Sequence, residues 1–204
     1  YQNYLQCVVR VDGPIRALAD LAGRPVSVGA PGSGAALTAA RVLEAAGLTT
    51  GSSAVVPSAL QLSVAVESLR DGTIDAFFWS GGVPIPAVLS LQREVPVTLA
   101  DLTPALPALV AAHPGEYVST AVPSGVYDTA RPIPAIGVSN LLVARPALAD
   151  DLAAALVDAL VEDAEALVPA DGVGVQYLTA SSLIDTAPVP LHPAAERRYR
   201  ERYG

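Results

Sequence analysis

The chain has 204 residues, of which 51% are hydrophobic, and its 12 arginines and 20 acidic residues give a formal net charge of −8. This acidic balance excludes an extended nucleic-acid-binding surface, which needs clustered basic residues. The hydrophobic content is enough for a sizeable core, yet no apolar run reaches the roughly 18 residues of a membrane-spanning helix. We therefore expect one large domain or two small lobes, with no membrane span in this chain.

Cys7 is the single cysteine, so the sequence excludes an internal disulfide and a multi-cysteine metal site. Its neighbours Leu5, Val8 and Val9 are apolar, and we expect a buried, inert thiol on a strand rather than a reactive one. The sequence contains no methionine, even at its first position, and opens directly on this strand-like segment. We expect a processed or truncated product whose natural N-terminus lies upstream.

The first half of the chain alternates between strand-like and helical patterns. We expect strands over residues 4–11, 25–28, 55–56 and 73–79, a short helix within 13–23, and longer helices over 33–46, 58–70 and 84–91. The continuous apolar run 73–79 has the length of a buried parallel strand. This alternation over residues 25–92 is the signature of an α/β fold with parallel strands.

The second half continues with strands and helices of less regular spacing. We expect strands over 95–99, 116–123 and 133–145, helices over 101–112 and around 174–184, and a solvated helix face in the basic end. An amphipathic helix begins near Asp150, with Leu152, Leu156, Leu160 and Leu167 on its apolar face. The proline-dense stretch 121–134 is the best candidate for a lobe boundary.

The stretch VSVGAPGSGAAL, residues 26–37, leads from a strand through a glycine-rich turn into a helix. Gly29 and Gly34 have the spacing of a phosphate-binding P-loop, but the Lys and Ser/Thr that this loop requires are replaced by Ala35 and Ala36. A dinucleotide fingerprint fails as well, because Leu37 stands where its third glycine belongs. The sequence therefore disfavours a nucleotide at this turn.

The features that remain in this turn are those of a general anion site. The first N–H groups of a helix have no intrahelical acceptor and carry a partial positive charge, which suits a carboxylate as well as a phosphate. Ser33 adds a hydroxyl and is placed to cap the helix. Taken alone, the turn is equally well explained by glycines chosen for their backbone angles.

A second glycine-rich segment, WSGGVPIP, follows the apolar strand at 73–79. Trp79 is the only tryptophan, and at the end of a buried strand it either packs on a ligand or belongs to the core. We expect Ser80, Gly81 and Gly82 to form a loop after the strand. In open α/β sheets, ligands bind at the edge where such loops follow the carboxyl ends of strands.

Residues suited to catalysis are few. His113 and His192 each precede a proline, and neither belongs to a cluster with metal-ligand spacing, so we expect structural or surface histidines. The nucleophile elbow G-x-S-x-G does not occur. We expect no enzyme activity, no metal and no cofactor.

Four stretches occur in an order that resembles the TAXI family of solute receptors for TRAP transporters. They are LAGRPVSVGAPGSG, LRDGTIDAFFWSGGVPIPAV, PIPAIGVSNLLVARPALADDLAAALVDAL and PLHPAAERRYRE. The resemblance covers nearly the whole chain and implies an α/β fold like that of type II periplasmic binding proteins, with parallel or mixed sheets flanked by helices. Nothing before Tyr1 corresponds to the N-terminal first-lobe segment of that family, so the first lobe would be incomplete.

The resemblance also implies how the chain is divided and where a ligand binds. Residues 12–130 would form the second lobe with the glycine-loop site, and residues 1–11 and 133–204 the hinge strand and the C-terminal part of the first lobe. Residues Ser33, Gly34 and Ala35 would offer N–H groups or a hydroxyl to a carboxylate. The facing wall would consist of Trp79, Ser80, Gly81 and Gly82.

A receptor of this family lies outside the cytoplasm, either periplasmic or as a cell-surface lipoprotein. It captures a small carboxylate or amino acid, such as glutamate, glutamine or a dicarboxylate, and delivers it to the membrane subunits of a TRAP transporter. Two alternatives remain open at this point. One is an enzyme of the same fold that acts on a small organic anion, and the other is an interaction module that binds no solute.

Overall fold

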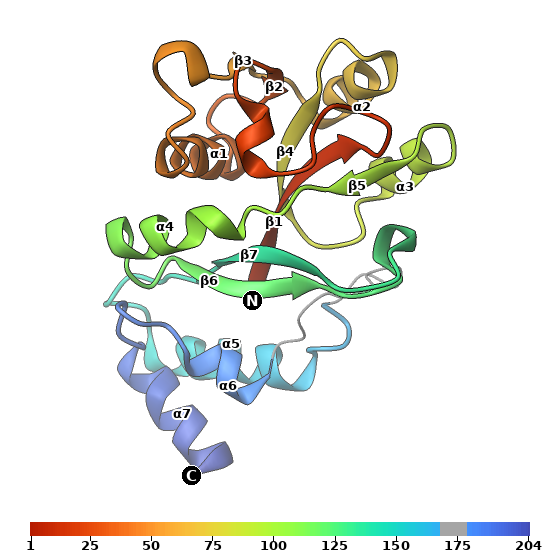
Figure 1. The fold of residues 1–204 in the computed structure, drawn as a ribbon. Helices are drawn as coiled ribbons and strands as arrows, with labels where there is room; N and C mark the ends of the chain where they lie inside the picture. Colours follow the sequence, from red (N-terminus) through yellow and green to blue (C-terminus); the bar gives the residue numbers. More distant parts are fainter. Residues whose placement is uncertain (168–178) are drawn as a thin grey trace.

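The computed structural model describes residues 1–167 and 179–204 and shows an α/β fold built on one seven-stranded mixed sheet (Figure 1). The strands are β1 (Gln2–Arg10), β2 (Pro25–Ser27), β3 (Val56–Ser58), β4 (Ala76–Gly81), β5 (Val97–Leu99), β6 (Tyr117–Val122) and β7 (Ile133–Ser139). Their order in the sheet is β3-β2-β4-β1-β7-β6, and β5 pairs with β1 beside β7. The predicted α/β class is therefore confirmed.

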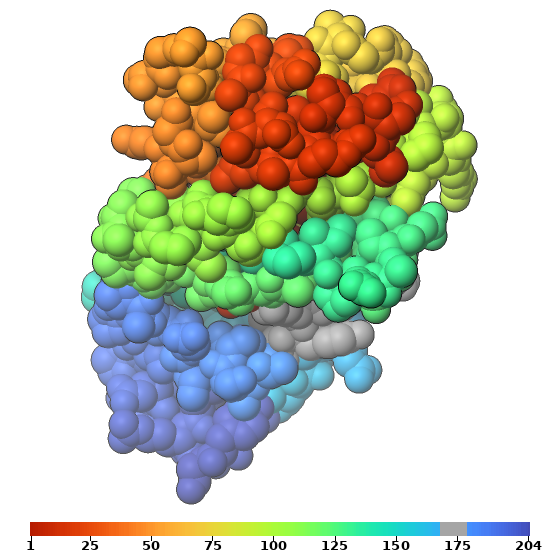
Figure 2. All heavy atoms as spheres, viewed as in Figure 1, coloured from red at the N-terminus to blue at the C-terminus, as the bar shows by residue number. Residues whose placement is uncertain are grey.

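The helices of the described residues lie around this sheet. They are α1 (Gly34–Ala45), α2 (Leu62–Asp71), α3 (Pro86–Gln92), α4 (Leu106–Ala112), α5 (Asp150–Glu162), α6 (Ala180–Ile184) and α7 (Pro193–Tyr203), with short 3-10 turns η1 (Leu18–Leu21), η2 (Gly51–Ser53), η3 (Thr103–Ala105) and η4 (Val126–Asp128). In Figures 1 and 2, α1 and α2 lie above β6 and β7, while α5, α6 and α7 lie below them.

Strand β1 is the centre of the sheet. It runs antiparallel to β4 on one side and to β5 and β7 on the other. Strand β2 is parallel to both β3 and β4, as the strand–helix alternation predicts for this part of the chain. The sheet is mixed because the first strand of the sequence inserts beside β4 in the opposite direction.

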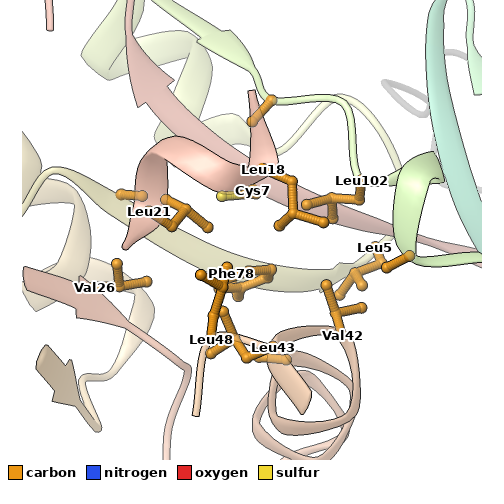
Figure 3. Packing of buried hydrophobic residues seen from close by; sticks show 14 of the residues in the cluster. Leu5, Cys7, Leu18, Leu21, Val26, Val42, Leu43, Leu48, Phe78 and Leu102 are labelled. Atoms are coloured by element: carbon orange, nitrogen blue, oxygen red, sulfur yellow. The ribbon is translucent and has the colours of Figure 1, made fainter. Parts of the chain in front are cut away.

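Two hydrophobic clusters cover the two faces of the sheet, because successive strand residues point to opposite sides. Leu5, Cys7 and Phe78 pack with Val42 and Leu43 of α1 on one face (Figure 3). On the other face, Tyr4, Val8 and Phe77 pack with residues of α2 and α3, which are Ala65, Leu69, Val88 and Leu91. Burying both phenylalanines removes about 2–3 kcal/mol each of unfavourable hydration.

Two elements have bounds that differ from the predicted ones because their residues take part in strand pairing. The helix expected over 58–70 begins only at Leu62, since Ser58 belongs to β3 and pairs with Ser27 of β2. The strand expected over 133–145 ends at Ser139, which lies opposite Gln2. Beyond Ser139, the Asn140 N–H donates to the Tyr1 carbonyl at 2.8 Å.

The predicted apolar face of the helix after Asp150 is wrong. Leu152 is 51% exposed and Leu156 is 38% exposed, whereas the smaller Ala153 and Val157 are buried. Leu160 is half-buried, and Leu167 is exposed beyond the end of α5. Helical spacing correctly predicts that α5 has an apolar side, but it does not show which side a neighbouring helix covers.

That neighbour is α7, the basic end of the chain. The solvated face that the sequence predicts is confirmed only in part, because Arg197 and Arg200 are exposed whereas Arg198 and Arg202 are partly buried. Three of the four arginines bind acidic side chains of α5. The pairs are Arg197 with Asp150, Arg198 with Asp158, and Arg202 with both Asp158 and Glu162. The Arg198 guanidinium donates two hydrogen bonds to Asp158, at 2.8 and 3.0 Å.

The sheet runs through both of the lobes that the resemblance implies, since β1 and β7 lie next to strands of residues 12–130. The lobe boundary itself stays a prediction. Of the helix expected around 174–184, the structure describes α6, and residues 174–178 lie outside the described part. No helix within the described ranges is long and apolar enough to cross a membrane.

Candidate functional site

The turn between β2 and α1 is shaped by glycines that no other residue could replace without strain. Gly29 has a φ of +97°, and a Cβ there would lie 3.1 Å from both the Ala35 Cβ and the Ala36 nitrogen. Gly32 also has a positive φ of +75°. The backbone at Gly29 therefore packs directly against the first turn of α1, which is a close approach that only glycine permits.

Ser33 is the N-cap of α1, as predicted. Its Oγ accepts a hydrogen bond of 3.1 Å from the Ala36 N–H, and its own N–H donates to the Ala30 carbonyl at 3.1 Å. This cap satisfies one of the N–H groups that a helix leaves unpaired at its start. Within the described residues, the N–H groups of Gly34 and Ala35 donate to no backbone acceptor.

Gly34 is exposed, and a Cβ added to it would meet no atom within 4 Å. The start of α1 thus faces open space at this residue. Ala35, in contrast, is buried against Gly29. Of the three residues predicted for this side of the site, Gly34 is exposed, Ser33 is half-buried and Ala35 is buried.

Ser27, at the end of β2, is a residue that the sequence reasoning missed. Its side chain is fully buried, and its Oγ has no hydrogen-bond partner within the described part of the chain. Buried hydroxyls are nearly always paired, so this orphan hydroxyl is an unsatisfied polar group in the core at the end of β2. The signal in the sequence is a serine between two valines in an apolar strand.

The second predicted segment differs from the expected loop. Ser80 and Gly81 belong to β4 and pair with Leu5 and Tyr4 of β1, so the strand runs two residues past Trp79. The prediction of a loop over these two residues is wrong. Glycine and serine have low strand preference, but the antiparallel neighbour β1 extends the ladder across them.

Gly81 leaves room on this strand for the side chain of Trp79. A Cβ on Gly81 would lie 2.8 Å from the indole Nε1 of Trp79, so the indole lies over the glycine backbone. Trp79 is half-buried and packs on the cluster that contains Phe77, on the face of the sheet opposite to α1. Gly82 lies just beyond the strand and is exposed.

The two segments share one edge of the sheet. Strand β2 ends at Ser27, opposite Phe77, whereas β4 continues to Gly81. The last residues of β4 therefore extend beyond β2, next to the turn that leads into α1. Trp79 and the start of α1 approach this edge from opposite faces.

The residues with potential catalytic chemistry have structural contacts. The Nδ1 of His192 accepts a hydrogen bond from the Ala194 N–H and caps α7, and the His113 ring stacks edge-on against Tyr117. Burial raises the pKa of Cys7 to about 12, which keeps the thiol protonated and unreactive. The described residues contain no group of three or more His, Cys, Asp or Glu that could hold a metal ion.

The model of the NMT1-like family matches residues 1–202, which is nearly the entire chain. The chain belongs to the NMT1-like family. The match covers the β2–α1 turn, β4 and all described helices except the last residue of α7.

Several solved structures resemble this NMT1-like chain. A periplasmic sulfonate-binding protein of an ABC transporter from Methylobacillus flagellatus has 16% identity and a TM-score of 0.48, over 79% of this chain and 41% of that one. A mutant of arginine-bound ArgBP from T. maritima has 16% identity and a TM-score of 0.33, over 68% and 48%. The GluR0 ligand-binding core from Nostoc punctiforme, in complex with L-glutamate, has 18% identity and a TM-score of 0.33, over 67% and 47%.

The NMT1-like chain therefore spans less than half of the length of each of these proteins. One hollow, of about 350 Å³, opens elsewhere on it, between α3, β5 and η4. This hollow contains none of the seven predicted site residues, and among the described residues that line it only Asp128 is charged. The carboxylate of Asp128 would repel an anion, so the hollow is less suited to bind an anion than the start of α1.

Proposed function

We propose that this chain is the ligand-binding part of an extracytoplasmic solute receptor that captures a small carboxylate and delivers it to a TRAP-type transporter. The observation that carries the proposal is the start of α1. There, a glycine turn folds onto a capped helix while Gly34 faces open space. The ligand classes that fit are glutamate, glutamine and related dicarboxylates.

The chemistry of this helix start favours a carboxylate over a nucleotide. Backbone N–H groups at a helix N-terminus, aligned with the helix dipole, bind an anion without any basic side chain. The turn contains neither lysine nor arginine, which a triphosphate and its metal ion would require. The net charge of −8 does not oppose such binding, since these dipoles act over a few ångströms.

Trp79, Ser80, Gly81 and Gly82 form the proposed second wall. The half-buried indole of Trp79 offers an apolar surface with one N–H donor, which suits the carbon chain of an amino acid. Gly82 lies beyond the strand and is exposed at the same edge.

The transporter class and the compartment are supported by the resemblance of the four sequence stretches to TAXI receptors. Residues 26–37 contain no acidic, basic or histidine side chain, which supports a binding rather than a catalytic role for this turn. Binding would place the ligand against preorganised amides, which avoids the entropic cost of ordering flexible side chains.

Calorimetric titration with L-glutamate, L-glutamine, 2-oxoglutarate and methanesulfonate tests this proposal. We expect the Gly34→Val variant to fold normally and to lose binding, because the added methyl groups occupy the open space before α1. Ala40→Val is the matched control, since it places the same β-branched side chain at an exposed position of the same helix. Equal affinity in Gly34→Val and the wild type would remove the α1 start from the site.

A further inference from the structure

A buried chain of hydrogen bonds holds the turn that follows β4, and it does not involve any of the predicted site residues except Gly82. The side-chain amide of Gln6 donates to the Gly82 carbonyl at 3.3 Å. The Tyr127 hydroxyl donates to the Gln6 Oε1 at 2.8 Å and accepts from the Ile85 N–H at 2.8 Å. The turn from Gly82 to Ile85 is therefore fixed at both ends by two side chains.

These two side chains come from distant parts of the sequence and are almost completely buried. Gln6 is 1% exposed in the central strand β1, and Tyr127 is 3% exposed in η4. Only a group that donates and accepts at the same time can connect the Gln6 carbonyl oxygen with the Ile85 N–H, and a tyrosine hydroxyl does both. Burial raises the pKa of Tyr127 to about 12, so the hydroxyl keeps its proton at physiological pH.

The backbone of Tyr127 adopts a conformation that is unfavourable for this residue type. Its φ is +55° and ψ is +36°, a left-handed conformation that a bulky residue rarely adopts. The Gln92 side chain donates to the Tyr127 carbonyl at 2.7 Å and fixes this conformation from outside. Strained residues of this kind persist where the surrounding contacts over-determine them, and they are concentrated at functional sites.

Gln6 also connects this network to Trp79. The two residues are direct partners across β1 and β4, so their side chains lie on the same face of the sheet. Trp79 packs on the hydrophobic cluster that contains Ile85 and Tyr127. The position of the indole and the position of the Gly82–Ile85 turn therefore depend on the same two polar side chains.

We propose that Tyr127, acting through Gln6, is a positioning residue that sets the geometry of the Trp79–Gly82 wall. The effect of Tyr127 on ligand affinity rests on the proposed function of that wall. Its effect on the position of Trp79 does not require any ligand. Removing the hydroxyl leaves the Gln6 Oε1 and the Ile85 N–H without their partner, and the turn must shift to satisfy them.

The test uses Trp79 as its own reporter, because it is the only tryptophan of the chain. We expect Tyr127→Phe to shift the tryptophan emission to longer wavelength and to increase quenching by acrylamide, both measured well below the melting transition. Gln6→Leu breaks the same relay from its other end and should shift the emission in the same direction. Tyr199→Phe, which removes a hydroxyl from another buried tyrosine in α7, should leave the emission unchanged.

The outcomes separate the two proposals. If Tyr127→Phe lowers the melting temperature but keeps the native emission and quenching of the wild type, Tyr127 is only structural and the inference is overturned. If the wild type binds L-glutamate, we expect Tyr127→Phe to bind it about tenfold more weakly, a loss typical of residues that act through others. If the wild type binds none of the tested solutes, the proposed function fails, whereas the emission of Trp79 still decides the role of Tyr127.

Discussion

Two glycines of the β2–α1 turn have opposite environments at the residue scale. Gly29 combines a φ of +97° with a Cβ position 3.1 Å from two atoms of α1, and Gly34 faces open space without a positive φ. The sequence shows both glycines equally, and the spacing of 29 and 34 does not distinguish their roles. Gly29 therefore has a role in the fold, whereas Gly34 has no such constraint and belongs to the site that we propose.

We predict that Gly29→Ala lowers the free energy of unfolding by roughly 1–3 kcal/mol, because alanine is strained at this φ and crowds Ala35 and Ala36. Gly34→Ala should leave stability unchanged or raise it slightly, since alanine favours a helix. Urea denaturation of both variants measures the difference. Equal stabilities of the two variants would contradict the assignment of Gly29 to the fold.

The buried thiol of Cys7 leads to a prediction about how stability depends on pH. Its pKa rises from 9.0 to about 12 on folding because burial disfavours the thiolate. The unfolded chain therefore loses its proton at lower pH than the folded chain, and stability decreases as the pH rises above 9.0. The decrease from this group should reach about 1.4 kcal/mol for each pH unit in that range.

Chemical denaturation of the wild type and of Cys7→Ala between pH 8 and pH 10 isolates this contribution, because the variant lacks the titrating group. In the same pH range, Ellman's reagent should react with Cys7 only after unfolding. A reactive thiol in the folded chain would show that Cys7 is not buried as described.

At the scale of elements, the sequence predicts where most strands and helices lie but not how they are paired. The apolar runs and helical spacings lead to β1, β2, β4 and α1 within a few residues of their bounds. Ser80 and Gly81 look like a loop because their own preferences favour one, and only the neighbouring β1 keeps them in a strand. The exposed Leu152 and Leu156 show the same limit for α5, whose covered side depends on α7.

The pairing of α5 with α7 depends on Asp158, which receives hydrogen bonds from both Arg198 and Arg202. The hydrogen bonds from Arg198 hold the pKa of Asp158 below its usual value. This contribution to stability is present above pH 3.8 and is lost as the pH falls, because protonation removes the charge that the arginines bind.

We predict that Asp158→Asn increases amide hydrogen exchange along α7 at pH 7, because the two arginines lose their shared carboxylate. The matched control is Glu196→Gln, which breaks a pair with Arg200 within α7 itself and should have little effect. Hydrogen exchange read by mass spectrometry distinguishes the two variants. Equal protection of α7 in Asp158→Asn and the wild type would show that apolar packing alone holds the helices together.

At the scale of the whole molecule, the central strand β1 joins the part that carries the α1 turn to the part that carries β6 and β7. The strand–helix alternation predicts an α/β fold, but it cannot show that the first strand inserts between β4 and β7. The Gln6–Tyr127 relay is missed for the same reason, since it connects residues 121 positions apart. Spacing along the chain predicts residues that lie near one another in the sequence, such as the cap Ser33, whereas contacts made through the sheet, such as the one between Gln6 and Tyr127, cannot be predicted from it.

Binding of a small carboxylate at the start of α1 can be measured residue by residue. The most direct measurement is a two-dimensional amide NMR titration of the chain with L-glutamate, L-glutamine and 2-oxoglutarate. We predict saturable shifts of the Gly34 and Ala35 amides and of the Trp79 indole N–H for at least one of these ligands. Saturable shifts around Asp128 with an unchanged Gly34 amide would contradict binding at the start of α1. The absence of binding of any of the three ligands would contradict it as well.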